Sequence, residues 1–440
     1  MPAENYNLPG YITAVMQRLQ ANGFEVYVVG GAVRDLLLHK TPLDYDLTTN
    51  ALPEQMIEIF NDRKLVLTGL KHGTVTVIEQ HCPVEITTYR VDGRYTDNRH
   101  PDSVQFTPDI KKDLARRDFT VNAMCYQSGT GVLDPFGGRQ DLAAGILRTV
   151  GEPDCRFKED ALRILRALRF AATLGFCLQQ QTETAVFSQA ILLRAVSRER
   201  ILAELKKLLL GKFAAPVLTN YLYVLLCAEP ALAAVIGRGS DPVSFLEVDR
   251  CPAVLPLRVA AFFACLGRAN QDLNALPKLE TADLGRLCRD PSESALPLCQ
   301  NAAAAMQTLR FDRKTTQTVL NLLRLLFLKT PQTESDYYAL CGFFGPKLTA
   351  DACRLKAAFY GNTAEMQAFE DACSRCFAGC CTVAQLNVTG GQLKALGLSG
   401  KAVGRALNGL LLAVQRQQCP NEQGALLRFA NENFVDRPKG

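Results

Sequence analysis

The hydrophobic pattern of this chain changes once, near residue 150, and that change constrains the fold more than any single motif does. Before it, helical stretches alternate with short runs rich in β-branched residues, which are typical of strands. These runs are EVYVVGG, KLVLTG, TVTVIEQ and CPVEITTYR. After it, from residue 159 onward, apolar residues recur every three or four positions, as in amphipathic helices. The sequence therefore predicts an α+β fold, with an N-terminal mixed α/β head followed by an all-helical remainder.

The length of 440 residues exceeds that of one ordinary domain. Segments that contain Pro and Gly interrupt the helical part, among them IGRGSDPV at 236–243 and KTPQ at 329–332. We expect an elongated molecule in four parts: a head at 1–150, a helical neck at 151–245, a helical body at 246–365 and a helical tail at 366–440.

The composition is that of a globular protein, with 48% hydrophobic and 21% charged residues. A net charge of +5 is compatible with binding nucleic acid but does not by itself indicate it. We find no apolar run of the roughly 18 residues that span a bilayer, and no signal peptide in MPAENYNLPGYITAVMQRLQ. The 16 cysteines lie in apolar, helix-like stretches, so we expect free thiols and a cytoplasmic protein without a membrane partner.

A glycine pair, Gly30-Gly31, closes the first predicted strand and opens a helix that carries Arg34. Glycines at such a turn let backbone N–H groups approach a polyanion, and the start of a helix favours negative charge. A guanidinium also matches phosphate oxygens with two donors. The pair fits neither GxGxxG nor a P-loop, so taken alone it is also compatible with an ordinary tight turn.

Two aspartates, Asp44 and Asp46, follow on an extended segment, where residues two apart point to the same face. Carboxylates so close repel each other unless a cation or water separates them, and Mg²⁺ prefers carboxylates together with substrate phosphates. A two-metal site needs a further carboxylate nearby, which Glu85 supplies if its strand lies next to the aspartates. A solvated loop and a solvent-facing Glu85 are the alternatives.

These motifs occur with several others, in order, over about the first half of the chain. The blocks are GGAVRDLLLHKTPLDYDL at 30–47, VEITTYR at 84–90, DGRYTDNRHPDSVQF at 92–106, RRDFTVNAM at 116–124, DPFGGRQDL at 134–142, EDALRILRALRFAA at 159–172 and SRERILAELKKLL at 197–209. Together they resemble the class II tRNA nucleotidyltransferase and bacterial poly(A) polymerase family, within the DNA polymerase β superfamily. The resemblance implies a polymerase β-like sheet and two Mg²⁺ ions held by Asp44 and Asp46, with Glu85 completing the carboxylate set.

The spacing of Asp160 and Arg163 predicts that they share one face of a helix. A carboxylate accepts from an exocyclic amine, and a guanidinium donates to a ring nitrogen or carbonyl. Cytosine and adenine offer that combination, whereas guanine and uracil present the opposite polarity. We therefore expect this pair to select CTP and ATP, as the matching residues of the family are thought to do. An ordinary ion pair within the helix is the alternative.

The resemblance assigns further residues to the nucleotide. Asp118 would orient the base-reading arginine, and Arg166 and Arg169 would assist with the nucleotide or brace the neck. The remaining nucleotide-binding candidates are Gly30, Gly31 and Arg34, with Arg117 and Asn122 at the sugar or triphosphate.

The implied activity is addition or repair of the 3′-terminal CCA of tRNA. CTP and ATP would be the substrates, pyrophosphate would be released, and no template or obligatory protein partner would be needed. The polar segment at 92–104 corresponds to a loop that in the family accompanies addition of the terminal A. Poly(A) addition, or A addition beside a separate CC-adding enzyme, are the alternatives. The sequence lacks the Gly-Arg-Arg/Lys-Phe element and the long basic C-terminal extension of the poly(A) polymerases, which favours the tRNA enzyme. A catalytically inactive RNA-binding relative would have a broken carboxylate set, and the set here is complete.

The segment LPLRVAAFFACLGRAN at 255–270 resembles the helix that carries a His-Asp metal motif in some relatives, but Ala264-Cys265 stands at that place. We therefore expect a structural helix in a degenerate, metal-free region. The cluster CSRCFAGCC contains Cys373, Cys376, Cys380 and Cys381 and could hold zinc. Its helical context and lack of a separated second pair favour buried thiols.

In the tail, the segment 388–411 predicts two helices joined by a glycine-containing turn. Basic side chains and exposed backbone N–H groups would contact an RNA backbone there. The alternative is a tight helical hairpin whose glycines serve helix packing. The candidate RNA-binding residues are Lys394, Gly397, Gly400, Lys401 and Arg405.

Overall fold

The computed structural model describes residues 5–93, 104–236, 243–268, 297–328, 340–361, 382–415 and 418–435, with the single positions 364, 367, 370, 371 and 380. The chain divides into two compact units. The first comprises Met1–Phe213 and Asn220–Glu229, and the second comprises Ala214–Thr219 and Pro230–Gly440. None of the described helices is long and apolar enough to pass through a membrane.

The head of the first unit is built on a seven-stranded sheet with the order β3-β4-β5-β2-β1-β8-β9. Neighbouring strands run antiparallel except β2 and β5, which are parallel. The strands of this sheet are β1 (Val26–Val29), β2 (Asp46–Thr49), β3 (Lys64–Val66), β4 (Thr74–Glu79), β5 (Cys82–Thr88), β8 (Cys125–Gln127) and β9 (Gly131–Leu133). The mixed α/β head predicted from the sequence is confirmed.

The four runs predicted as strands form β1, β3, β4 and β5, whereas β2 carries no apolar alternation. Its inner positions include Thr48 and Thr49, which are fully buried because their hydroxyl groups find backbone partners. Thr49 Oγ1 donates to the carbonyl of Glu25 at 2.5 Å, and Thr48 Oγ1 donates to that of Thr87 at 3.1 Å. A strand that buries hydrogen-bonded threonines appears polar in the sequence.

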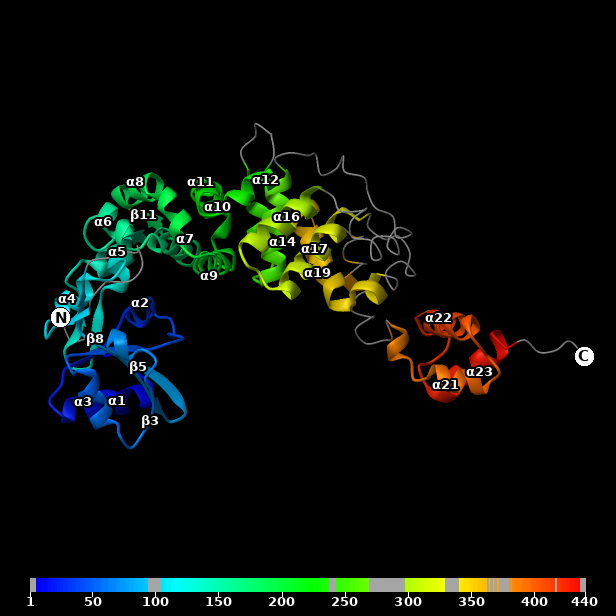
Figure 1. Cartoon of the computed structure of the whole chain (residues 1–440), viewed down its shortest axis with the longest axis horizontal. Coiled ribbons are helices and arrows are strands. Elements are labelled where there is room, and N and C mark those ends of the chain that lie inside the picture. The colour runs from blue at the N-terminus through cyan, green and yellow to red at the C-terminus, as the bar shows by residue number, and fades with distance from the viewer. Residues whose placement is uncertain are drawn as a thin grey trace, which may run out of the picture. The chain divides into compact units, whose positions relative to one another are not determined.

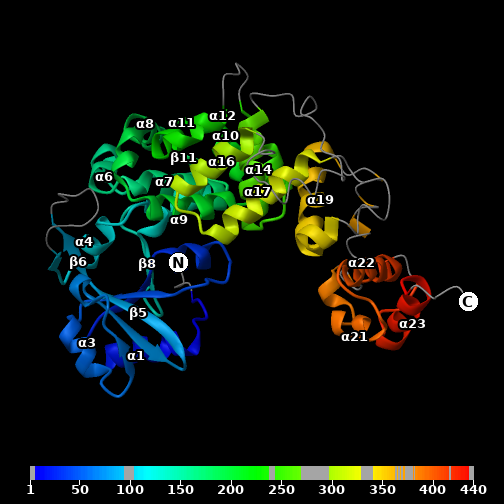
Figure 2. The same cartoon turned by 45° about the vertical axis from the view of Figure 1, so that its right-hand side comes forward.

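Helices cover the sheet and lead out of it. Helices α1 (Gly10–Ala21) and α3 (Pro53–Ile59) contact each other and pack against strands of the sheet, and they lie side by side in both Figure 1 and Figure 2. The other head elements are η1 (Leu70–His72), β6 (Arg90–Asp92), β7 (Val104–Phe106), α2 (Gly31–Leu37), α4 (Ile110–Ala115), η2 (Thr120–Asn122), α5 (Gly138–Ala144) and β10 (Ile146–Leu147).

The neck of the first unit is helical, as predicted, but its first helix breaks where the sequence suggested continuity. Asp160 has extended backbone angles (φ −143°, ψ 102°) between α6 and α7, so the helix expected from residue 159 starts later. The Asp160 carboxylate accepts a hydrogen bond from the N–H of Leu162 and caps the second helix. The neck elements are α6 (Pro153–Glu159), α7 (Leu162–Leu174), β11 (Cys177–Leu178), α8 (Gln180–Ser188), η3 (Ala190–Ala195), α9 (Arg198–Leu209) and α11 (Leu222–Ala228).

The second unit is helical wherever the structure describes it. Helix α14 (Leu255–Arg268) is almost entirely buried and occupies the predicted range, and Ala264 and Cys265 face the core. Before the tail, the elements are α10 (Ala214–Asn220), η4 (Pro230–Leu232), α12 (Ala233–Ile236), α13 (Leu246–Arg250), α16 (Pro297–Thr308), α17 (Arg313–Phe327) and α19 (Pro346–Tyr360).

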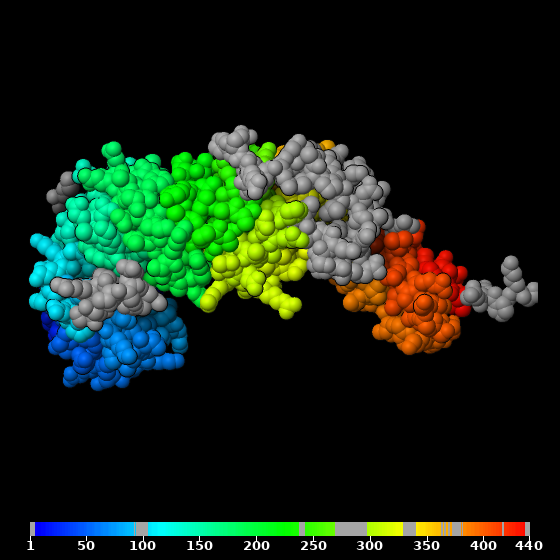
Figure 3. All heavy atoms as spheres, turned by 45° about the horizontal axis from the view of Figure 1, so that its top comes forward, coloured from blue at the N-terminus to red at the C-terminus, as the bar shows by residue number. Residues whose placement is uncertain are grey.

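The tail residues have an apolar core of their own. Leu393, Ala406, Leu410 and Leu426 are fully buried within it, and Figure 3 shows residues 382–435 (orange to red) as a close-packed group of atoms. The tail elements are η6 (Val383–Gln385), α21 (Gly390–Ala395), α22 (Lys401–Gln415) and α23 (Gln423–Asn433).

Candidate active site

The turn at Gly30 requires glycine on two grounds. Its backbone has φ 74° and ψ −131°, which L side chains rarely adopt, and its N–H donates to the carbonyl of Met124 at 3.2 Å. A Cβ there would also lie 2.9 Å from Nη1 of Arg117. Gly31 starts helix α2 with a negative φ and looser surroundings, since its Cβ would meet Arg34 at 3.5 Å. The first glycine therefore brings an arginine against the backbone.

Sheet register places the glycine turn and two carboxylates in one line across three strands. Val29, directly before Gly30, pairs with Asp46 on β2, and Asp46 pairs with Glu85 on β5. Residues paired in register point to the same face of a sheet. Asp44 precedes Asp46 by two positions, on the segment leading into β2. The structure thus brings together all three predicted carboxylates at the end of β1.

These three carboxylates share an absence of partners. The side chains of Asp44, Asp46 and Glu85 are exposed and have no hydrogen-bond or ion-pair partner in the part of the chain that the structure describes. Partial desolvation raises the pKa of Asp46; Arg117 opposes this and Asp44 adds to it. A carboxylate whose negative charge is disfavoured by its own neighbour gains when a cation arrives.

The donor set at this edge suits Mg²⁺, which binds hard carboxylate oxygens and keeps places for water and phosphate. Within the described residues, no three His, Cys, Asp or Glu side chains are already arranged around a common metal position. Asp44 and Asp46 are therefore the residues that could hold a cation, with Glu85 on the neighbouring strand.

Arg34 is fixed on two sides. Its Nε and Nη2 donate to one oxygen of Asp35 at 2.9 and 2.8 Å, and its Nη1 donates to Oδ1 of Asn122 at 2.8 Å. The Arg34 side chain is only 11% exposed, so burial and these hydrogen bonds together hold the guanidinium in place. The predicted triphosphate arginine and the predicted sugar contact, Asn122, are therefore direct neighbours.

Arg117 lies between the glycine turn and a buried carboxylate. Its Nη2 is 3.8 Å from Oδ2 of Asp113, a side chain with no exposed surface. Asp113 also accepts from Arg116 Nε at 2.9 Å and from the backbone N–H of Arg90 at 3.2 Å. Burial lowers the pKa of Arg117, against the opposing effects of Asp113 and Asp46. The guanidinium nevertheless stays charged, because arginine is protonated far above neutral pH.

Asp118 is the hub that joins head and neck within the first unit. Its Oδ2 accepts from Nε and Nη2 of Arg166 at 2.8 and 2.6 Å, and its Oδ1 accepts from Asn122 at 3.3 Å and from the N–H of Phe119 at 2.9 Å. Burial alone would raise the pKa of Asp118, but Arg166 and these hydrogen bonds outweigh it and lower that pKa. The arginine that Asp118 orients is Arg166, on the neck helix α7.

Asp160 and Arg163 do not contact each other as an ion pair. Asp160 Oδ2 accepts from Nη2 of Arg200 on α9 at 2.8 Å, while its other oxygen caps α7. Arg163 is 8% exposed and donates to Glu159 and to the carbonyls of Arg156 and Arg116. The interpretation as an ordinary ion pair within one helix is therefore wrong, because each residue has its own partner.

The structure also shows charged residues that the sequence did not single out. Glu204 on α9 is 6% exposed and lies 2.6 Å from Arg169 and 3.9 Å from Arg166. The block SRERILAELKKLL contained a signal for it, because Glu204 falls on the apolar face of an amphipathic helix. The other residues of this kind are Asp113, Glu159 and Arg200.

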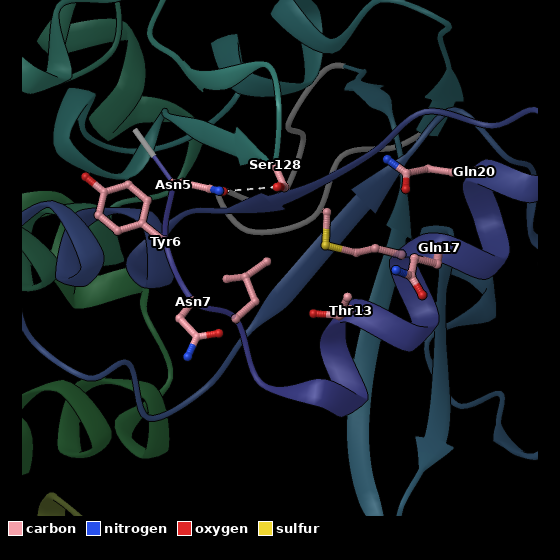
Figure 4. A pocket seen from close by; sticks show the side chains of 9 residues that line it. Asn5, Tyr6, Asn7, Thr13, Gln17, Gln20 and Ser128 are labelled. Carbon is pink, nitrogen blue, oxygen red and sulfur yellow. Dashed lines mark hydrogen bonds between the residues drawn. The ribbon is translucent and has the colours of Figure 1, made fainter. Parts of the chain in front are cut away.

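A separate hollow of about 560 Å³ lies at the other end of the sheet. It opens between the N-terminal segment and α1, where Asn5 accepts from Ser128 at 3.1 Å (Figure 4). Sheet register places Ser128 level with Val26, at the opposite end of β1 from Gly30. No charged side chain is among its lining residues, which are Asn5, Tyr6, Asn7, Leu8, Thr13, Met16, Gln17, Gln20 and Ser128. Such a lining does not suit a triphosphate.

Three of the tail glycines do not serve helix packing. Gly397 and Gly400 have positive φ (94° and 53°), and a Cβ at either of them or at Gly404 would meet no described atom within 4 Å. The alternative of a hairpin held by glycine contacts is therefore wrong for these three. Lys394 lies in the last turn of α21, and Lys401 and Arg405 lie on α22, all with exposed side chains, so the predicted basic residues border an open turn.

Two predicted features lie wholly or partly outside the described residues: the loop at 94–103, and three of the four clustered cysteines, Cys373, Cys376 and Cys381. The fourth, Cys380, is buried; burial raises its pKa, and its thiol donates to the carbonyl of Thr382 at 3.3 Å. A protonated thiol so engaged is a poor metal ligand.

The head thus combines a mixed sheet, carboxylates on adjacent strands beside a glycine turn, and arginines supplied by the helices that follow. Residues 26–148 match the family described as "Poly A polymerase head domain", and residues 175–221 match "Probable RNA and SrmB- binding site of polymerase A". Two segments of the first unit are thus similar in sequence to parts of poly(A) polymerase, one in the head and one in the neck.

Curated relatives and solved structures point to the same enzymes. The chain is 47% identical over 204 residues to the CCA-adding enzyme of Geobacillus thermodenitrificans, which covers 46% of this chain and 50% of that protein. It is 45% identical over 200 residues to the CCA-adding enzyme of Leuconostoc mesenteroides, again about half of each protein. The Bacillus stearothermophilus CCA-adding enzyme in complex with CTP superposes with a TM-score of 0.70 at 28% identity, over 96% of both chains. The Thermotoga maritima CCA-adding enzyme complexed with tRNA shares the fold, with a TM-score of 0.59 at 19% identity over 97% of both chains.

Proposed function

We propose that this protein adds or repairs the 3′-terminal CCA of tRNA, using CTP and ATP and releasing pyrophosphate. The observation that carries the proposal is the alignment of Val29, Asp46 and Glu85 across three strands, directly beside the Gly30 turn and Arg117. The relatives that match half of the chain are CCA-adding enzymes, and one solved structure of similar fold over the whole chain is such an enzyme with CTP.

At the reacting end, Asp44 and Asp46 would hold two Mg²⁺ ions, with Glu85 completing the carboxylate set. Bound Mg²⁺ would lower the pKa of the attacking 3′-hydroxyl and neutralise the departing pyrophosphate. The role of the chain is to keep these carboxylates exposed, without a hydrogen bond or close ion pair that would occupy their oxygens. The lack of partners among described residues supports this role.

At the triphosphate, the arginines would act as preoriented donors. Arg34 and Arg166 each use two nitrogens on a carboxylate, so their planes are fixed before the nucleotide arrives. Arg166 is 35% exposed and can turn its remaining N–H groups to a phosphate. Arg117 stands against the Gly30 turn, where a phosphate could also meet backbone N–H groups. Preorientation of this kind lowers the entropic cost of binding.

At the base, Asp160 would accept from the exocyclic amine and Arg163 would donate to the ring. The hydrogen bond from Arg200 to Oδ2 of Asp160, at 2.8 Å, holds this carboxylate in one orientation. Guanine and uracil present a carbonyl oxygen where cytosine and adenine present the amine, so they would place acceptor against acceptor. Burial of that mismatch costs more than a weak contact gains.

The tail residues Lys394, Lys401 and Arg405, with the open glycines Gly397 and Gly400, would contact the tRNA backbone. Their exposed positions and the free space beside the glycines support this role. No protein partner is required by any of these steps, and a cytoplasmic location fits the free thiols that the described cysteines form.

A second function, poly(A) addition, is favoured by the description of the family that matches the head, and A addition beside a CC-adding partner is a third. One experiment separates them. A tRNA transcript lacking CCA is incubated with Mg²⁺ and each NTP singly and together, and the products are resolved on a gel. Two C then one A, with a stop there, supports the proposal; a long A ladder on many RNAs indicates a poly(A) polymerase, and A addition only to tRNA ending in CC indicates a divided pathway.

A further inference from the structure

Phe170, on neck helix α7, lies at the centre of three guanidinium groups. The Cζ atom of Arg169 is 3.8 Å from the centre of its ring, that of Arg34 is 5.4 Å away and that of Arg166 is 5.6 Å away. Phe119 supports the ring edge-on, with centroids 5.7 Å apart and planes at 80°. Phe170 is 6% exposed, so these contacts are made largely out of water.

Each of these three arginines also has its own carboxylate partner, and the three carboxylates lie on three different segments of the chain. Asp35 of α2 holds Arg34, Asp118 holds Arg166, and Glu204 of α9 lies beside Arg169. The ring is what the three pairs have in common. A cation over an aromatic face gains about 0.5 to 2 kcal/mol, more when it is desolvated.

The contact of Arg169 depends most on the ring. Its Nε is 2.6 Å from Oε2 of Glu204, but neither atom has a hydrogen-bond partner among the residues that the structure describes. Charge attraction without an aligned hydrogen bond leaves the orientation of a guanidinium poorly fixed. Stacking on Phe170 at 3.8 Å supplies the orientation that the carboxylate does not.

We propose that Phe170 is a positioning residue for the triphosphate of the nucleotide, because it holds three arginines of the head and neck in one mutual arrangement. Arg166 and Arg169 of α7 and Arg34 of α2 repel one another as like charges, and the negative face of the shared ring offsets that repulsion. The inference rests on the proposed function, in which Arg34 and Arg166 serve the triphosphate, and it extends that role to Arg169. Phe170 itself does not touch the substrate.

The chain offers a matched control. Phe60, at the end of α3, is fully buried and carries Arg18 at 5.2 Å from its ring centre, and Arg18 pairs with Asp62 at 2.6 Å. Phe60→Leu removes a buried ring with a guanidinium over it, as Phe170→Leu does, but away from the glycine turn. Phe170→Tyr keeps the aromatic face and serves as the conservative variant.

The experiment uses the full-length variants and two readouts: kinetics with CTP on tRNA lacking CCA, and direct calorimetric binding of inorganic triphosphate. Melting temperatures show that each variant is folded. We expect Phe170→Leu to raise KM for CTP and the Kd for inorganic triphosphate about tenfold with little change in kcat, since lost ground-state binding changes KM. Phe60→Leu should lower the melting temperature yet leave both constants at their wild-type values, and Phe170→Tyr should keep them within about threefold of wild type.

Equal KM and Kd values for Phe170→Leu and Phe60→Leu would overturn the inference and make Phe170 an ordinary core residue. Equal losses for Phe170→Tyr and Phe170→Leu would also overturn it, because the aromatic face would then be irrelevant. The triphosphate titration needs no turnover, so it separates this failure from that of the proposed function. If the wild type binds inorganic triphosphate, Phe170→Leu weakens that binding, and the wild type adds no CCA, the inference stands and the proposed function is wrong.

Discussion

Buried charged residues have different partners in the two units. In the first unit, Asp113, Asp118 and Glu204 are buried beside Arg117, Arg166 and Arg169. Asp44 and Asp46, at the start of the central strand β2, stay exposed. In the second unit, buried charged side chains form hydrogen bonds with backbone groups. Arg258 is 5% exposed and donates to Asp249 at 2.9 Å, and Asp249 accepts from the N–H groups of Ala214 and Ala215.

The difference lies in what each network leaves open. Arg166 donates to Asp118 through Nε and Nη2 and is still 35% exposed, so in the proposed function it keeps N–H groups for a phosphate. Around Asp249 both oxygens are used by the start of α10 and by Arg258, whose Nε donates to the carbonyl of Pro252 at 3.3 Å. Substitutions in the first network should change catalysis or nucleotide binding, and those in the second should change stability.

The largest effect is expected at the exposed carboxylates. Asp46→Ala, and separately Asp44→Ala, should lower kcat for CTP incorporation by about a thousandfold or more, because the cation that activates the 3′-hydroxyl loses a ligand. Gel assays of primer extension and tRNA filter binding measure the two properties. The matched control is Asp62→Ala, an exposed carboxylate paired with Arg18 and Arg63. Loss of tRNA binding with unchanged turnover would contradict the metal assignment.

The second unit should respond in the opposite way. Asp249→Ala removes the acceptor for Arg258 and for the N–H groups at the start of α10, so we expect the free energy of unfolding to fall by about 3–5 kcal/mol with KM for CTP unchanged. Asp351→Ala is the control, because its ion pair with Arg354 is partly exposed and worth about 0.5 kcal/mol or less. Denaturant titration gives both values. An altered KM in folded Asp249→Ala would break the distinction between the two units.

Base selection should show an intermediate effect. Asp160→Ala removes the acceptor for the exocyclic amine, so the preference for CTP over UTP should fall by about ten- to a hundredfold in kcat/KM. Asp154→Ala, on helix α6 and bonded to Gln189, is the control. Selectivity retained in Asp160→Ala would move the base-reading role to another residue.

How much of this could be predicted depends on how local the signals are. Strands β4 and β5 followed from β-branched alternation, and the carboxylates followed from spacing, because both are short-range patterns. Strand β2 was missed because hydrogen-bonded threonines hide its burial. The break at Asp160 was missed because an acid that caps a helix resembles one inside it.

The partners of the arginines were beyond the sequence for a different reason. Glu204 falls on an apolar helix face. Its charge can be buried there because Arg169, thirty-five positions earlier in the chain, lies beside it. Phe170 has the same property. Its three cationic neighbours come from two helices separated by most of the head. Pairings of this kind are tertiary, and hydrophobic periodicity carries no record of them.

A smaller effect is expected in the tail. Lys401→Ala and Arg405→Ala should each weaken tRNA binding uniformly across tRNA sequences and reduce the slope of log Kd against log salt by about one, as loss of one phosphate contact does. Filter binding at several salt concentrations measures the slope. Arg428→Ala on α23 is the control, and an unchanged slope in Lys401→Ala and Arg405→Ala would remove these residues from the RNA contact.

The smallest expected effect is a pH-dependent change in the melting temperature, caused by the charge of Asp46. Because desolvation and Asp44 raise the pKa of Asp46 above its ordinary value of 3.8, ionised Asp46 makes the folded state less stable as pH rises through that raised pKa. Asp46→Asn should therefore raise the melting temperature slightly at neutral pH. The gain should shrink toward zero near pH 4, where protonated Asp46 and Asn are alike. Added Mg²⁺ should stabilise the wild type and not the variant. A gain in melting temperature that does not depend on pH would instead indicate an effect of packing. The exposed carboxylates would then not differ in their electrostatics from the paired charges of the second unit.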